Sequence, residues 1–236
     1  MEKIKILKIG ISDVSTKEAL EETKRWLKSG GKKRYIVTPN PEFLVAAQND
    51  REFNAILNNA DLALPDGMGL IWASRILNQP LKGRITGVDF MEKLCFLAAK
   101  DGFTIGLIGG GPTVAERASE CLKKKYPGLK IVLAQEDWKD LERGEEINLL
   151  FVALGAPKQE IWMSQNLERL PVKVAMGVGG AFDYLAGIVP RAPKWMRNLG
   201  LEWLFRLICQ PWRIKRQTAL IKFVYLVLLQ KFKGSG

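Results

Sequence analysis

The sequence predicts an α/β fold with an open, doubly wound and mostly parallel β-sheet, a Rossmann-like arrangement. Short apolar runs alternate with helical patterns between residues 34 and 183, and nearly all of these runs end in Gly, Pro, Asn or Asp. Such alternation is typical of βαβ units, whose strands are parallel. The chain is also long enough, at 236 residues with 47% hydrophobic content, to bury a large core without disulfide bonds.

Six apolar runs are predicted to be buried parallel strands, because they are short, rich in aliphatic residues and bounded by turn residues. In chain order they are "RYIVTPN", "ADLALPDG", "FTIGLIGGG", "LKIVLA", "INLLFVALG" and "VKVAMGVGG". The N-terminal "MEKIKILKIG" contains alternating charges and no long apolar stretch. We therefore expect a first strand there and not a signal peptide.

Four stretches between these runs are predicted to be helices, because their apolar residues recur every three or four positions. They are "PEFLVAAQNDREFNAIL", "GVDFMEKLCFLAAKDG", "TVAERASECLKKKYPG" and "PKQEIWMSQNLERL". A glycine follows the periodic part of two of them, as is common at helix ends.

The C-terminal segment differs from the rest of the chain in its charge. From Pro190 to Gly236 it has ten Lys or Arg residues and one acid, Glu202, so it contains most of the net charge of +11. We therefore predict an α/β domain over residues 1–195 and a basic, amphipathic helical appendage over residues 196–236. Its run "ALIKFVYLVLL" is interrupted by Lys222 and is about half as long as the ~20 residues of a membrane-spanning helix. A concentrated basic segment indicates an anionic partner, with a solvated helix face as the alternative.

The sequence has no histidine, and its three cysteines, Cys95, Cys121 and Cys209, are far apart. Proton transfer at neutral pH is therefore left to carboxylates, Cys, Lys or Tyr. Scattered cysteines without a C-x-x-C pair do not offer the usual zinc-ligand spacing, and they favour a reducing compartment. We expect no metal site and a cytoplasmic protein.

Polar residues follow the first two predicted strands, at the sheet edge where open α/β folds bind ligands. Thr38 and Asn40 come after "YIV", and Asn40 is also a natural cap for a helix that begins at Pro41. Asp66 comes after "LAL" and is able to cap the next helix. Because the chain lacks histidine, Asp66 is also the candidate for accepting a proton from an attacking hydroxyl. The two roles do not exclude one another.

Three consecutive glycines, Gly109, Gly110 and Gly111, separate another predicted strand from a helix. Their N–H groups and the helix N-terminus are able to receive a phosphate, and a tight turn alone is the alternative. The stretch lacks the G-x-G-x-x-G spacing of dinucleotide-binding folds and the Gly-Lys-Ser/Thr of a P-loop.

Two further strand ends supply candidates. Lys158 and Gln159 lie in the first turn after "LFVALGAP", where they would face a ligand, while Glu160 beside them complements the helix dipole. Asp183 follows the glycines of "GVGG" and is a further candidate for binding a ligand. The alternative is that a glycine in this stretch is only a C-terminal helix cap.

Taken together, these motifs resemble those of the WecG/TagA/CpsF glycosyltransferases, glycosyltransferase family 26, over nearly the whole chain. The matching stretches, in the family's order, are "TPNPEFLVAAQND", "LPDGMGL", "RITGVDF", "GLIGGG", "LFVALGAPKQE", "GVGGAFDYLAG", "RAPKWM" and "LEWLFRL". The resemblance implies an inverting enzyme that moves a sugar, N-acetylmannosamine or a related hexose, from a UDP-sugar to a polyprenol-diphosphate-linked sugar. It also implies synthesis of a wall teichoic acid-like polysaccharide on the inner face of the cell membrane. No cofactor and no metal are implied, and the chain has no metal-binding D-x-D.

The same resemblance gives roles to the candidate residues. It makes Asp66 the base that deprotonates the acceptor hydroxyl. The residues that it places around the reacting sugars are Thr38, Asn40, Arg84 and Gln159. The residues that it places at the departing UDP are Gly109, Gly110, Gly111 and Asp183.

In the appendage, the resemblance implies that arginines close over the active site and hold the acceptor diphosphate. These are Arg206, Arg213 and Arg216. We expect helices from about Asn198 onward to lie on the anionic membrane surface with a set of apolar residues buried in it, which are Trp203, Leu204, Phe205, Trp212 and Phe223. The alternative is a subunit interface in a homo-oligomer.

The chain departs from the family pattern between "LKIVLA" and "INLLFVALG", where it has only the short stretch Gln135–Glu146 and no "GYF" element. Donor contacts from that loop are therefore not carried over, and the sequence does not choose the sugar. Two other classes compete with a transferase. A basic nucleic-acid-binding protein would use the interleaved Trp and Arg of the tail, but the tail's apolar stretches favour a membrane. A dinucleotide-dependent oxidoreductase would need a glycine fingerprint that the chain lacks.

Overall fold

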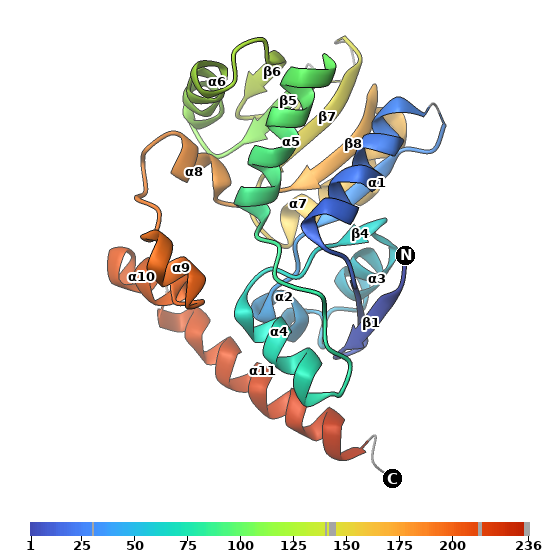
Figure 1. Ribbon diagram of the computed structural model, residues 1–236, viewed down its shortest axis with the longest axis vertical. Helices are drawn as coiled ribbons and strands as arrows, with labels where there is room; N and C mark the ends of the chain where they lie inside the picture. Colours follow the sequence, from blue (N-terminus) through green and yellow to red (C-terminus); the bar gives the residue numbers. More distant parts are fainter. Residues whose placement is uncertain (30, 140, 142–144, 212–213, 234–236) are drawn as a thin grey trace.

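The computed structural model describes residues 1–236 except 30, 140, 142–144, 212–213 and 234–236, and it does not describe the side chains of 198 and 214–217 (Figure 1). Its central sheet has six parallel strands in the order β4-β3-β8-β7-β5-β6. Their bounds are β3 (Arg34–Val37), β4 (Leu62–Ala63), β5 (Thr104–Gly109), β6 (Lys130–Gln135), β7 (Ile147–Ala153) and β8 (Val172–Gly177). The predicted fold class and all six predicted strands are confirmed, although β4 has only two residues.

The sheet is buried on both faces, which explains why its strands are continuous apolar runs. Along β7, Leu149 and Phe151 belong to one core cluster, whereas Leu150 and Val152 belong to the other. Helices contribute to these two clusters from opposite faces of the sheet. On one face lie α1 (Thr16–Lys28), α5 (Gly87–Asp101), α6 (Val114–Lys125) and α8 (Ala181–Leu185). On the other face lie α2 (Pro41–Ala46), α3 (Arg51–Asn59), α4 (Met68–Ile76) and α7 (Lys158–Asn166).

The N-terminal residues form a separate antiparallel hairpin of β1 (Lys3–Ile6) and β2 (Ile9–Ser12). The first strand was expected, whereas β2 was not. The hairpin turn uses Leu7 and Lys8 at φ angles of 49° and 68°, where Gly or Asn is the usual signal. The sequence therefore contained no recognisable signal for this turn.

The predicted helix from residue 41 to residue 57 is two helices, α2 and α3. Asp50 starts the second one, because its side chain accepts the N–H of Phe53. Helix α1 was also not predicted, although Ser15 and Glu18 begin it with a complete capping box.

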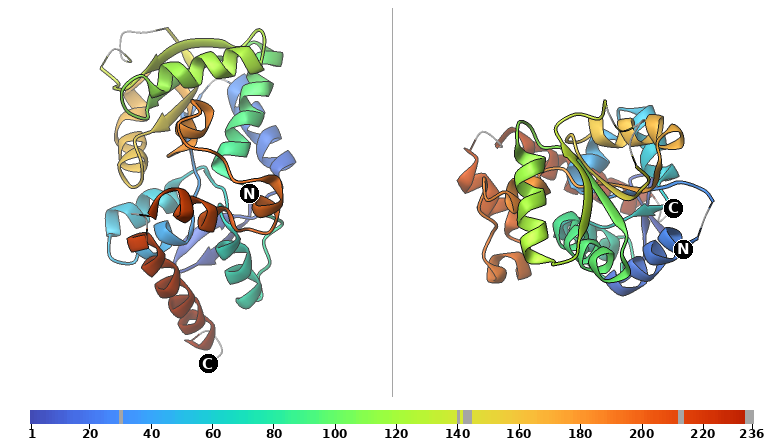
Figure 2. Two further views of the ribbon diagram at one scale, coloured as in Figure 1. Left: turned by 90° about the vertical axis from the view of Figure 1, so that its left-hand side faces the viewer. Right: turned by 90° about the horizontal axis from the view of Figure 1, so that it is seen from above.

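The segment predicted as the appendage, residues 196–236, contains the end of α9 (Lys194–Asn198), all of α10 (Glu202–Cys209) and α11 (Ile214–Lys233). Helix α11 packs along α2 and α4, at the opposite end of the molecule from α6 (Figures 1 and 2). Phe223 is only 3% exposed and belongs to the main core together with Val227. The expectation that Phe223 inserts into a membrane is therefore wrong, because this face of α11 is already covered by the protein. Within the described residues, no helix is long and apolar enough to cross a membrane.

Candidate active site

A cavity of about 940 Å³ opens at the carboxyl ends of β3, β4, β7 and β8. Its other walls come from α4, α10 and α11, so the appendage closes one side of it. The cavity brings together six residues that the sequence nominated, namely Thr38, Asn40, Asp66, Arg84, Gln159 and Arg206. Since parallel strands share one carboxyl edge, the topology alone explains why loops far apart in sequence meet here.

Asp66 lies in the loop after β4, and its backbone N–H donates to the carbonyl of Pro39 at 2.9 Å. Its carboxylate accepts the N–H of Gly87 at the start of α5, at a long distance of 3.4 Å. The helix that follows Asp66, α4, has Gly67 as its N-cap and no side-chain cap bond within the described chain. The prediction that Asp66 caps the next helix is therefore wrong.

The surroundings of Asp66 disfavour its charged form. Burial raises the pKa of this carboxyl to about 7, and the negative charge of Glu202 adds to the rise. The Gly87 N–H and the positive charge of Arg84 oppose it. A carboxyl with a pKa near neutral pH is suited to accept a proton from a reacting hydroxyl.

Thr38 and Asn40 flank Asp66 from the loop after β3. The Thr38 hydroxyl donates to the carbonyl of Gly177, 3.4 Å away. The Asn40 side chain accepts the N–H of Phe43 at 3.1 Å, and Pro41 is the first residue of α2. Asn40 is thus a helix cap, as the sequence predicted, and it lines the cavity as well.

Gln159 is a bracing side chain within the cavity wall and is only 2% exposed. Its amide oxygen accepts the N–H of Gly179 at 3.0 Å, and its amide nitrogen donates to Glu160 at 2.6 Å. Lys158, the residue before it, is exposed and is absent from the described cavity lining. Both residues were predicted to face a ligand, but of the two only Gln159 is among the described residues that line the cavity.

Arg206 of α10 reaches the loop after β8. Its guanidinium stacks over Tyr184, 5.3 Å from the ring centre, and a Cβ on Gly180 would lie 2.5 Å from its Nη2. Asp183 lies close by, since the same Cβ would be 3.2 Å from its carboxylate. Burial raises the pKa of Asp183, while the charge of Arg206 opposes the rise. Asp183 itself is not among the described residues that line the cavity.

An ion-pair network that the sequence analysis missed joins the appendage to the start of α5. Asp89 accepts Arg191 at 2.7 Å and lies 3.6 Å from Arg197, and Arg191 lies 3.7 Å from Glu202. Arg84 donates to the backbone carbonyl of Arg197 at 2.8 Å. These residues lie within the quoted stretches "RITGVDF", "RAPKWM" and "LEWLFRL" or, for Arg197, just after one of them, but nothing in the sequence indicated that these charges meet.

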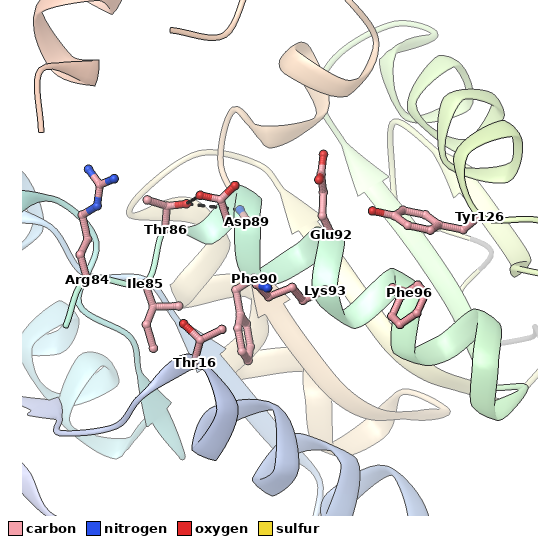
Figure 3. Close-up of a pocket in the computed structure, with 10 residues that line it drawn as sticks. All are labelled: Thr16, Arg84, Ile85, Thr86, Asp89, Phe90, Glu92, Lys93, Phe96 and Tyr126. Carbon is pink, nitrogen blue, oxygen red and sulfur yellow. Dashed lines mark hydrogen bonds between the residues drawn. The ribbon is translucent and has the colours of Figure 1, made fainter. Parts of the chain in front are cut away.

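A second cavity, of about 550 Å³, runs along α5 beside this network. Arg84 lies at one end of it, and Phe96 and Tyr126 lie at the other (Figure 3). Thr86 donates to Asp89 at 2.6 Å near the Arg84 end. Among the nominated residues with described side chains, Arg84 alone borders this cavity.

The three glycines after β5 have positive φ angles of 95°, 87° and 86°. A Cβ on Gly109 would come within 2.7 Å of the Ala153 backbone, so this residue must be glycine for packing alone. A Cβ on Gly111 would meet nothing within 4 Å. The glycines occupy the same sheet edge as the large cavity, but none of them is among its described lining residues.

Two nominated arginines are not placed by the structure. Arg213 and the side chain of Arg216 lie outside the described residues, as does Trp212. Trp203 is exposed at the cavity, and Leu204 and Phe205 are half-buried. In the described part of the chain, no three Cys, Asp or Glu side chains gather as potential metal ligands.

Comparison with known proteins gives a consistent result. The family described as "Glycosyl transferase WecG/TagA/CpsF family" matches residues 4–236. A protein of Bacillus subtilis (strain 168), named N-acetylglucosaminyldiphosphoundecaprenol N-acetyl-beta-D-mannosaminyltransferase, is 36% identical over 204 residues, which cover 83% of this chain and 79% of that protein. A protein of the same name from Bacillus spizizenii (strain ATCC 23059 / NRRL B-14472 / W23) is 34% identical over 201 residues, covering 82% and 78% of the two chains.

Proposed function

This chain belongs to the WecG/TagA/CpsF family of glycosyl transferases, and from that membership we propose a specific reaction. The protein transfers N-acetylmannosamine from UDP-N-acetylmannosamine to an N-acetylglucosamine that is linked through diphosphate to a polyprenol. This reaction is a step in the synthesis of a wall teichoic acid-like polymer. The names of the two Bacillus relatives support the transferred sugar and the acceptor. The observation that supports the site most strongly is the raised pKa of Asp66 inside the large cavity.

In this reaction Asp66 is the general base. Its carboxylate takes the proton from the acceptor hydroxyl, the hydroxyl oxygen forms a bond to the anomeric carbon, and the bond from that carbon to UDP breaks. Attack from the face opposite to UDP inverts the anomeric centre. Thr38, Asn40 and Arg84 surround the reacting sugars and fix their orientation, which is a large part of catalysis in two-substrate reactions. Gln159 contributes to the same pocket through the wall that it braces.

The leaving diphosphate develops negative charge, and N–H groups at the sheet edge are suited to stabilise it. We place UDP across the carboxyl ends of β8, β7 and β5, toward Gly109, Gly110 and Gly111, with Lys158 and Asp183 near it. Arg206 stands beside Asp183 and Gly180 in the cavity wall. With Arg213 and Arg216 it holds the acceptor diphosphate, because a guanidinium offers two parallel donors to a phosphate.

The appendage brings this site to the inner face of the membrane. Exposed apolar side chains lie on α9, on α10 and between them, beside the cavity, namely Trp195, Leu199, Trp203 and Ile208. They accompany the basic residues of the same segment, and this combination favours an anionic lipid surface. A homo-oligomer that buries the same side chains is the competing arrangement.

The experiment that tests the reaction combines UDP-N-acetylmannosamine with a short-chain N-acetylglucosaminyl-diphosphate lipid. We expect a β-linked disaccharide product and full activity in EDTA. UDP should also raise the melting temperature, since a ligand that binds only the folded state stabilises it. Protection by NAD or by an oligonucleotide instead of UDP, with no sugar transfer, would contradict the proposal.

A further inference from the structure

Glu160 is a fully buried carboxyl for which the proposed reaction has no use. It lies in the first turn of α7, directly after Gln159, and it is 0% exposed. Its Oε2 atom has no hydrogen-bond partner among the described residues. Burying a carboxyl with one oxygen unbonded is costly, which points to a role of this group in its surroundings.

The bonds of Glu160 lead directly to the cavity. Its Oε1 accepts the Gln159 amide nitrogen at 2.6 Å, and the Gln159 amide oxygen accepts the Gly179 N–H at 3.0 Å. A carboxylate only accepts hydrogen bonds, whereas a carboxamide has one accepting and one donating end. If the Gln159 amide turned over, its nitrogen would face the Gly179 N–H and its oxygen would face the carboxylate. Glu160 and the Gly179 N–H together therefore hold the amide in one orientation.

The neighbouring glycines show that this arrangement is packed tightly. A Cβ on Gly177 would lie 2.9 Å from the Gln159 amide nitrogen and 3.1 Å from Glu160 Oε1. Two residues further along the chain, Gly179 lines the cavity at a φ of 51°, and Gly180 lies against Arg206. The series Glu160, Gln159, Gly179 thus connects a buried carboxyl to the loop that supports Arg206.

We propose that Glu160 is a positioning residue for sugar transfer, which holds the Gln159 carboxamide so that Gln159 fixes the Gly179–Gly180 loop in the cavity wall. The effect on catalysis rests on the proposed function, whereas the effect on the loop does not. Losing the acceptor at residue 160 leaves the Gln159 amide held by the Gly179 N–H alone, so the side chain and the loop are able to shift. Misplacement of a site by about 1 Å is able to cost about 100-fold in rate.

The test compares three variants with a matched control. Glu160→Leu removes the acceptor, Glu160→Asp retracts it while keeping the charge, and Glu160→Gln keeps an acceptor of the same reach. The control is Asn166→Leu on the same helix, because Asn166 is a buried polar residue that is absent from the described cavity lining and whose bonds, to the Trp162 carbonyl and from the Arg169 guanidinium, lead away from the Gln159 amide. Two readouts are needed, which are kcat of the folded protein and hydrogen exchange of the segment 178–181.

We expect Glu160→Leu and Glu160→Asp to lower kcat by about tenfold to 100-fold and to speed exchange in the segment 178–181. Glu160→Gln should stay within about threefold of the parent kcat, because it keeps an acceptor for the Gln159 nitrogen while the Gly179 N–H still selects the parent orientation. Asn166→Leu should leave both readouts unchanged. In a Gln159→Ala background, Glu160→Leu should cause no further loss, because the two residues act through one another.

Parent-like kcat and exchange in a folded Glu160→Leu or Glu160→Asp would overturn the proposal, and so would additive losses in the double variant. If Glu160→Leu does not fold, Glu160→Asp carries the test. If the parent protein transfers no sugar, the proposed function fails, while the exchange of the segment 178–181 still decides whether Glu160 fixes the loop.

Discussion

The sequence allowed two roles for Asp66, a cap for the next helix and a general base, and its hydrogen bond to Gly87 excludes the first. The carboxylate points to the Gly87 N–H of α5, at 3.4 Å, and makes no cap for α4 within the described chain. A hydrogen bond of this length is weak, so burial dominates and the pKa rises to about 7. The ionised form of Asp66 therefore lowers the stability of the folded protein. Such unfavourable environments are common for groups that act in catalysis.

This state predicts how stability depends on pH. Between its ordinary pKa and a value of about 7, Asp66 is protonated in the folded protein and ionised in the unfolded chain. Its contribution to stability is therefore present at low pH and is lost as pH rises through that window. Replacing Asp66 with Asn should raise the melting temperature over the parent at about pH 8 and change it little at about pH 4. Thermal melts of both proteins test this, and a difference that does not vary with pH would contradict it.

The sequence nominated residues that the fold brings to one cavity, but it did not reveal their partners. Thr38, Asn40 and Asp66 were found because they follow buried strands, and the fold brings strand ends together. Glu160 was assigned to the helix dipole, because a sequence does not show that a carboxyl is buried. The pairing of Asp89 with Arg191 joins residues far apart in sequence, and surface charges give no signal of such a contact.

At the scale of elements, the same physical reason decides what could be predicted. The strands of the main sheet were found because burial on both faces makes each one a continuous apolar run. The split between α2 and α3 was missed because a single cap, Asp50, interrupts an otherwise periodic stretch. Helix α11 was recognised as a helix, but its apolar residues were assigned to one partner, whereas the structure divides them between the protein core and the outer surface.

The two faces of α11 predict opposite mutational effects. Phe223 is packed against α2 and α4, so Phe223→Ala should lower the free energy of unfolding by about 3 kcal/mol. Phe232 is 75% exposed on the same helix, so Phe232→Ala should change it by less than about 0.5 kcal/mol. Denaturant unfolding of the two variants measures both values. Equal effects would mean that α11 does not pack as described.

At the scale of the whole molecule, charge and apolar exposure coincide at the appendage. Ten basic residues and the exposed Trp195, Trp203 and Ile208 lie between Pro190 and Gly236, the segment that includes the appendage and closes the cavity. The ion pairs of Asp89 with Arg191 and Arg197 attach that segment to the sheet domain. Attachment to a membrane would therefore also hold the cavity wall against the acceptor.

Vesicle binding tests this arrangement. Each basic residue near an anionic surface contributes about 1 kcal/mol, and salt screens the attraction. Binding to anionic vesicles should therefore weaken as salt is added, while the apolar side chains retain part of it. The variant Trp203→Ser with Ile208→Ser should bind more weakly, whereas Phe96→Ser, an exposed aromatic on α5, should bind as the parent does. Parent-like binding by the double variant, with self-association lost, would assign the surface to a homo-oligomer.

The most direct test of the central claim, that the large cavity is a transferase site with Asp66 as its base, is the pH dependence of kcat/KM with a soluble acceptor. Because the carboxylate must be ionised to accept a proton, kcat/KM of the parent should rise about tenfold per pH unit up to about pH 7 and then level off. Asp66→Asn should bind UDP with the parent affinity and lose about 100-fold to 10,000-fold in kcat at about pH 8. An Asp66→Asn variant that retains the parent rate, with the same rise toward pH 7, would show that another group accepts the proton and that the account is wrong.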